Sequence, residues 1–101
     1  ISNVGDLVDE SGNIFEVVAD YNYVIQNEGH MNLRHEKLPH LRKQNAYIIM
    51  VDVCNKSVFC KKAKDFPFFK IKNFAPFGGK PVYRIYLNDD VHKFKQIERV
   101  S

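Results

Sequence analysis

The chain has 101 residues and a mass of 11.8 kDa, which is the length of one ordinary domain. Its hydrophobic fraction of 45% and charged fraction of 27% support a packed core and exclude a wholly disordered chain. The longest apolar run covers six residues, 46–51, whereas a membrane-spanning helix needs about 20. We therefore expect a single domain over residues 1–101 and no transmembrane segment.

The start of the chain and its cysteines suggest where the protein resides. Ile1 is not an initiator methionine, and residues 1–6 lack the basic end and apolar centre of a signal peptide, so we expect a fragment of a longer chain. Two cysteines, Cys54 and Cys60, are too few for the disulfide framework of a small secreted domain. Free thiols and a cytoplasmic location are the prediction.

Charge is distributed unevenly along the sequence. Residues 1–30 contain six acidic residues and no Lys or Arg, whereas the remaining 71 residues contain 15 basic and six acidic ones. The two parts therefore carry −6 and +9. A positive field of this size attracts phosphate-bearing small molecules, nucleic acid or acidic surfaces, and does not choose among them.

The first third of the chain predicts a hairpin, a helix and a loop. Two apolar runs flank Ser11-Gly12-Asn13, so residues 8–18 should form a β-hairpin. Asp20 can cap a short helix that extends through Asn27, with Gly29 just past its end. Residues 30–45 are polar and contain Pro39, and we expect a loop there.

The rest of the chain predicts a second hairpin and a further strand. Residues 46–54 and 57–62 read as paired strands around Asn55-Lys56, in a register that does not pair Cys54 with Cys60. Prolines at 67 and 76 argue against a regular element over 66–77. A strand over 82–87 and a turn over 88–90 follow, and 91–100 fits either a helix or an irregular strand.

Three histidines invite a metal hypothesis. His30, His35 and His40 recur every five residues, whereas ligands on one helical face recur every three or four. Solvated surface histidines are therefore the expected interpretation.

Residues 61–80 combine six lysines and one acid with five phenylalanines. Cations attract phosphates and aromatic faces stack on bases, so this mixture suits a nucleotide or single-stranded nucleic acid such as RNA. In the alternative interpretation, the phenylalanines belong to the hydrophobic core and the lysines form the solvent-exposed face beside it. A third hypothesis is a protein-interaction module that uses exposed phenylalanines, and it would lose its basis if Phe66, Phe68 and Phe69 were all fully buried in one core.

The order of several short motifs adds a family resemblance. These motifs are Leu7–Asn13, Leu38–Arg42, the strand Ala46–Val53, Lys61–Lys64 and Ala75–Gly79. In this order they resemble the front half of a Nudix hydrolase domain, over about residues 6–79. Within that superfamily they look most like the branch that includes isopentenyl diphosphate isomerases.

The resemblance implies a fold, an activity and a few site residues. The fold is an α/β (α+β) arrangement, a mixed β-sheet core with flanking helices in an α/β/α sandwich. The activity is metal-dependent hydrolysis of a nucleoside diphosphate linked to another group, with Mg²⁺ or Mn²⁺ held by glutamates of a helix after the double glycine. The carried-over substrate-binding positions are Lys62, Gly78, Gly79, Arg42 and His40, and no metal ligand can be carried over.

The sequence departs from the family where its metal-binding glutamates belong. Ile85 occupies the place of the first of them, and no glutamate-rich run follows. Either the helix is missing between Gly79 and Lys80, or a Nudix-like domain binds nucleotide or RNA without cleaving it. The first explanation predicts a break, with the two Cα atoms much farther apart than the about 3.8 Å of a peptide link.

Overall fold

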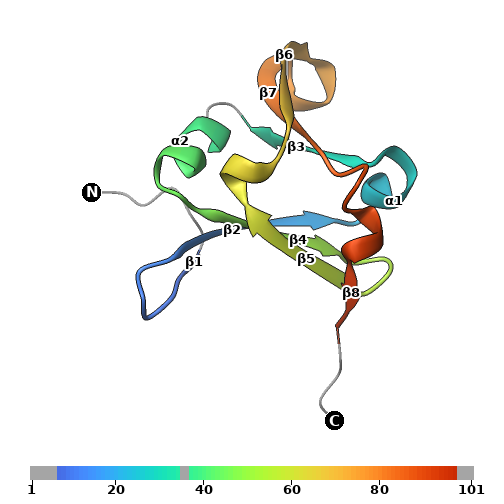
Figure 1. Ribbon diagram of the computed structural model, residues 1–101. Coiled ribbons are helices and arrows are strands. Elements are labelled where there is room, and N and C mark those ends of the chain that lie inside the picture. Colours follow the sequence, from blue (N-terminus) through green and yellow to red (C-terminus); the bar gives the residue numbers. More distant parts are fainter. Residues whose placement is uncertain (1–6, 35–36, 98–101) are drawn as a thin grey trace.

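The computed structural model describes residues 7–34 and 37–97 and shows two β-sheets with two helices (Figure 1). The predicted α+β class, with a mixed sheet and flanking helices, is confirmed. The second layer, opposite the mixed sheet, is formed by a smaller sheet together with both helices. No helix in the described ranges has the length and apolarity needed to cross a membrane.

The larger sheet has five strands in the order β1-β2-β4-β5-β8. Their bounds are Leu7–Val8, Ile14–Asp20, Tyr47–Asp52, Ser57–Lys62 and Lys95–Gln96. β2 and β4 are parallel and the other neighbours are antiparallel. Parallel neighbours need a long crossover, and here it contains α1, β3 and α2.

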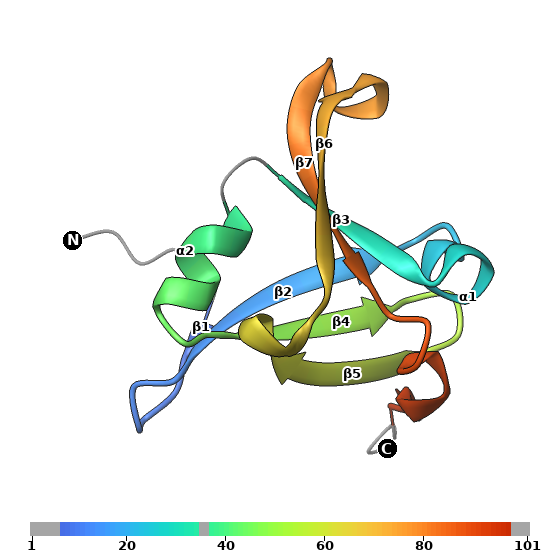
Figure 2. The same cartoon turned by 45° about the horizontal axis from the view of Figure 1, so that its top comes forward.

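The smaller sheet is antiparallel, with β7 (Lys80–Tyr86) between β3 (His30–Arg34) and β6 (Phe68–Phe74). Figure 2 shows the β6–β7 hairpin projecting beyond the rest of the molecule. Three short 3-10 turns, η1 (Ala63–Asp65), η2 (Ala75–Phe77) and η3 (Val91–Lys93), join these strands to their neighbours.

Asp20 accepts a hydrogen bond from the first helix as predicted, but the N-cap residue is Tyr23 at φ 60° and the helix is shorter than expected. α1 spans Val24–Glu28, and the Asp20 carboxylate accepts the backbone N–H of Ile25 at 2.8 Å. Gly29 ends the helix at φ 66°, where its N–H donates to the Ile25 carbonyl.

The core lies between the two sheets. Alternate residues of β2 and β4 face inward, and the helices contribute Ile25 from α1 and Leu38 and Leu41 from α2. Fully buried members include Ile25, Leu38, Leu41, Ile48, Met50 and Ile85. The opposite faces of the two sheets point away from this core.

The expected loop over 30–45 is wrong, since most of this segment forms a strand and a helix. Its apolar residues are few, but they have the spacing of a strand in the first part and of a helix in the second. Met31 and Leu33 alternate on β3, and Leu38 and Leu41 lie three apart on α2 (Lys37–Lys43), each facing the core. Pro39 sits in the first turn of α2, where a missing N–H costs no helical hydrogen bond.

The expected irregular segment over 66–77 is also wrong. Pro67 and Pro76 flank β6 instead of interrupting it, and β6 is an edge strand. The described tip of this hairpin is continuous: the Gly79 N–H donates to the Phe74 carbonyl at 3.0 Å, and Phe74 pairs with Lys80. The predicted break near Gly79 is therefore wrong, and β7 is entered directly from the glycine turn.

The second hairpin and the last strand agree with the predictions apart from their ends. Asp52 pairs with Ser57, so the loop between β4 and β5 has four residues, 53–56, instead of two. Cys60 pairs with Ile49 and not with Cys54, as expected. The ambiguous stretch 91–97 forms η3 and β8, and 98–100 lie outside the described residues.

Replacing Gly29 with alanine should destabilise the domain more than the same change at Gly12. Both glycines have positive φ, which costs an L-residue about 1–2 kcal/mol. A Cβ at Gly12 meets nothing within 4 Å, whereas one at Gly29 overlaps the Asn88 side-chain oxygen. Urea unfolding should therefore give a lower free energy of unfolding for G29A than for G12A. Adding Asn88→Ala to G29A should reduce the difference between the two variants. Equal losses for the two glycines would contradict the described packing.

Candidate nucleic-acid interface

The solvent side of the three-stranded sheet combines cations with aromatic rings. Paired residues share a face, so the register places three residues of β3, four of β7 and three of β6 on this side. We call this set the basic face: His30, Asn32, Arg34, Lys80, Val82, Arg84, Tyr86, Phe69, Ile71 and Phe74, of which Val82 is fully buried.

Cations and rings alternate on the basic face by direct contact. The Arg84 guanidinium lies 5.9 Å from the Phe74 ring centre, and Arg34 lies 5.7 Å from that of Phe77 in η2. Arg84 also donates through Nε to Asn32 Oδ1 at 3.1 Å, which fixes its plane. Phe69, which pairs with Arg84, is 55% exposed and free to receive a stacked base.

The charge of the basic face is positive without compensation from its own strands. The face carries three cations, Arg34, Lys80 and Arg84, and the strands β3, β6 and β7 contain no Asp or Glu. Burial and the nearby Arg84 lower the pKa of His30 from its usual 6.5, against the effect of Glu28. His30 is therefore mainly neutral at physiological pH, and the positive charge comes from the arginines and lysines.

A basic pocket of about 740 Å³ lies at the hairpin tip beside the basic face. Three cations line it, Arg34, Lys37 and Lys80, together with Phe77, Gly78 and two prolines. Lys37 Nζ lies 2.6 Å from the buried carboxylate of Glu16, so its charge is partly neutralised. Arg34 and Lys80 are exposed and supply most of the field that would attract a phosphate.

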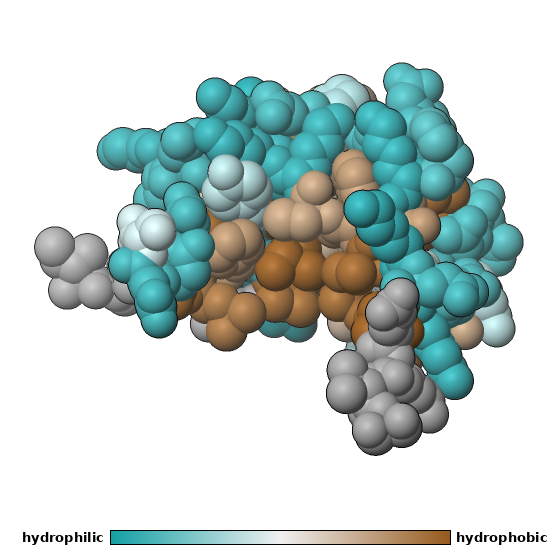
Figure 3. Space-filling view, turned by 60° about the horizontal axis from the view of Figure 1, so that its bottom comes forward, coloured by the Kyte–Doolittle hydropathy of each residue, from teal (hydrophilic) through white to brown (hydrophobic). Residues whose placement is uncertain are grey.

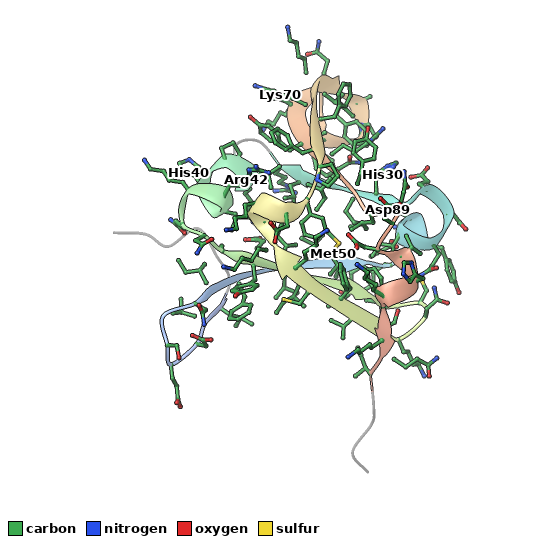
Figure 4. The ribbon with its side chains drawn as sticks, viewed as in Figure 1. His30, His40, Arg42, Met50, Lys70 and Asp89 are labelled. Atoms are coloured by element: carbon green, nitrogen blue, oxygen red, sulfur yellow. The ribbon has the colours of Figure 1, made fainter. Side chains whose placement is uncertain are left out.

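The substrate-binding residues expected from the family resemblance lie on separate surfaces. Lys62 ends β5 and lies 5.5 Å from the Tyr47 ring on the solvent side of the larger sheet. Figure 4 shows His40 and Arg42 on α2. His40 is exposed, whereas Arg42 donates to the Phe66 carbonyl at 3.3 Å and covers the Phe68 ring at 4.9 Å.

The glycine pair forms the turn of the β6–β7 hairpin. The N–H groups of Gly78 and Gly79 donate to the carbonyls of Ala75 and Phe74, both at 3.0 Å. These two donors are therefore engaged within the turn, and only Gly78 borders the basic pocket.

The residues after the glycine pair do not fit a divalent cation. β7 follows directly and has no carboxylate, and among residues 7–34 and 37–97 no group of three or more His, Cys, Asp or Glu could hold a metal. Figure 4 places His30 beside α1 and His40 on α2 at the far side of the molecule. His35 lies outside the described residues.

Sequence reasoning missed the arginines of the basic face. Arg34 lies in the segment expected to be a loop, and Arg84 lies within the expected strand over 82–87, where its residue type alone does not mark a site. Alternation in His30-Met31-Asn32-Leu33-Arg34, polar at every second position, was the available signal. It places His30, Asn32 and Arg34 on one side of a strand whose other side is apolar.

Comparison of the chain with family models, with curated proteins and with solved structures gave no match in any of the three. The Nudix resemblance and the hydrolase activity that it implies therefore stay predictions.

Proposed function

We propose that this domain is a non-catalytic module that binds single-stranded nucleic acid on its basic face. The observation that carries the proposal is the sheet surface on which Arg34 and Arg84 alternate with the rings of Phe69, Phe74 and Phe77. Bases of any sequence can stack on such rings while the guanidinium groups contact phosphates.

The exposure of Phe69 favours the nucleic-acid interpretation of residues 61–80. Phe66 is core, with 2% of its surface exposed, and Phe68 pairs with Ile85 on the opposite side of the sheet, where Arg42 covers its ring. Phe69 is 55% exposed, and a ligand that covers this ring would restore the hydrophobic stabilisation lost to water. Its position beside Arg84 favours a ligand that is both aromatic and anionic.

Binding should be measured by fluorescence anisotropy with labelled single-stranded RNA and DNA oligonucleotides over a range of salt concentrations. Contacts with about three to five phosphates predict that log K falls with log salt at a slope of roughly −2 to −3.5. Free nucleoside diphosphates should bind more weakly, since one nucleotide covers only part of the face. Binding that is absent, or unaffected by salt, would contradict the proposal.

Two variants with matched controls locate the surface. Phe69→Ala should weaken binding by about 1–3 kcal/mol, the value of one stacked base, whereas Tyr21→Ala, an exposed ring elsewhere, should not. Lys80→Ala should reduce the salt slope by about 0.7, whereas Lys43→Ala on α2 should leave it unchanged. Equal effects of variant and control would place binding elsewhere.

The same samples test the hydrolase hypothesis. Nucleoside diphosphate derivatives incubated with Mg²⁺ and the chain should remain intact if the module only binds. Release of phosphate or a nucleoside monophosphate would instead support the Nudix-type activity.

A further inference from the structure

The solvent side of the five-stranded sheet is apolar. The register places eleven residues there in three rows across the strands, which we call the apolar face: Leu7, Phe15, Tyr47 and Lys62; Val17, Ile49 and Cys60; Ala19, Val51, Val58 and Lys95. Figure 3 shows the hydrophobic surface as a continuous band with a hydrophilic border. Leu7 and Val17 are 54% and 36% exposed.

The sequence of β4 is that of a strand covered on both sides. Tyr47-Ile48-Ile49-Met50-Val51 is an unbroken apolar run, whereas a strand with one side in water alternates with polar residues. Ile48 and Met50 lie in the core, and Tyr47, Ile49 and Val51 lie on the apolar face. A covering layer for this face is therefore expected, since exposed apolar patches of this kind mark interaction sites.

We propose that a second copy of this chain covers the apolar face, so that two five-stranded sheets pack face to face about a two-fold axis parallel to β4. Sheets in such sandwiches lie about 10 Å apart, and a two-fold axis pairs one patch with itself. The face is apolar and about 20 Å long on its three central strands, β2, β4 and β5, and the two-residue strands β1 and β8 widen it at opposite ends.

Charge selects the second copy and its orientation. Lys62 and Lys95 lie on the β5–β8 side of the face, and the β1–β2 turn with Asp9 and Glu10 lies on the other side. An axis parallel to β4 brings the β5 side of one copy over the β2 side of its partner, with Lys62 toward the partner's acidic turn. An axis across the strands would instead place lysines over lysines, which is unfavourable.

The acidic turn retains its charge. Asp9 accepts hydrogen bonds from the side chain of Asn13 and from the backbone N–H groups of Asn13 and Ser11. These bonds hold the pKa of Asp9 below its usual 3.8, and the bond from the Asn13 side chain has the largest effect.

Sedimentation velocity of the whole chain from the low to the high micromolar range tests the proposal. We expect a weak, reversible monomer–dimer equilibrium, since a face of this size makes an interface smaller than the about 1,200–2,000 Å² of stable specific complexes. Val17→Lys should weaken dimerisation at least tenfold, whereas Tyr21→Lys, a 68% exposed residue outside the face, should leave it unchanged. A monomer at every concentration, or a dimer insensitive to V17K, would overturn the proposal.

Two further measurements report on orientation and on burial of the face. Lys62→Glu should weaken the dimer, and Glu10→Lys in the same chain should restore it; a stronger dimer with K62E would overturn the parallel axis. Alkylation of Cys60 should slow as the protein concentration rises, while Cys54, which donates to the Tyr21 carbonyl at 3.1 Å, serves as the internal control. Equal rates for Cys60 at all concentrations would overturn the proposal.

Discussion

Truncating Phe66 to alanine should lower the free energy of unfolding by about 3–5 kcal/mol, the usual cost of removing a fully buried phenylalanine. Only 2% of this side chain is exposed, and it belongs to the core cluster between the sheets. The Lys61 ammonium also lies 5.1 Å from its ring centre and would lose that contact. For a domain of this length, such a loss is a large part of a total stability of about 5–15 kcal/mol.

Phe69→Ala is the matched control for this truncation. The same atoms are removed from a ring that is 55% exposed, so the expected change in stability stays within about 0.5 kcal/mol. Guanidinium unfolding at neutral pH should therefore separate the two variants clearly. Similar losses for both would mean that Phe69 is packed in the protein in solution and is not available to stack on bases.

Replacing Asp90 with asparagine should cost about 2 kcal/mol at neutral pH, because two ammonium groups converge on this carboxylate. Lys61 Nζ lies 2.8 Å from one oxygen and Lys93 Nζ 3.0 Å from the other, and the Asp90 side chain is 6% exposed. The expected loss is smaller than for a fully buried pair, since both lysines retain contact with water. Asp89→Asn, an exposed neighbour in the same turn, is the control (Figure 4).

The pH dependence of stability gives a second test of Asp90. Burial by itself would raise the pKa of this carboxyl, but the hydrogen bonds and charges of Lys61 and Lys93 outweigh it and hold the pKa below its usual 3.8. The ion pairs therefore stabilise the fold fully above the unfolded-state pKa of Asp90. This stabilisation is lost as the pH falls through the lower pKa of Asp90 in the folded state. The stability difference between the wild type and D90N should vanish in that acidic range. A constant difference would contradict the prediction.

Local patterns determined the elements that form between neighbours in the sequence. The Ser11-Gly12-Asn13 turn, the Asp20 cap with Gly29 at the end of α1, and the β4–β5 hairpin rest on contacts between residues close along the chain. Turn chemistry and capping act over a few residues, so the sequence shows them directly.

Long-range pairing determined the elements that the sequence concealed. β6 forms because its edge position beside β7 tolerates prolines at both ends, and β3 forms because β7 offers hydrogen bonds to a short polar segment. Neither partner can be identified from periodicity in five to seven residues. The family resemblance also could not indicate how the glycine pair is used, since its N–H donors close the hairpin turn.

The α+β class came from the family resemblance, whereas the residues by themselves determined the apolar core strand β4 and the mixture of lysines and phenylalanines that suits a nucleic acid. Only the tertiary structure decided which of those phenylalanines are buried, because Phe66 and Phe69 differ in their distance from the core and not in their residue type. It also brought Arg34 and Arg84, fifty residues apart, onto one face through the β3–β7 pairing. A residue's chemistry is local, whereas its exposure and its neighbours depend on the whole chain.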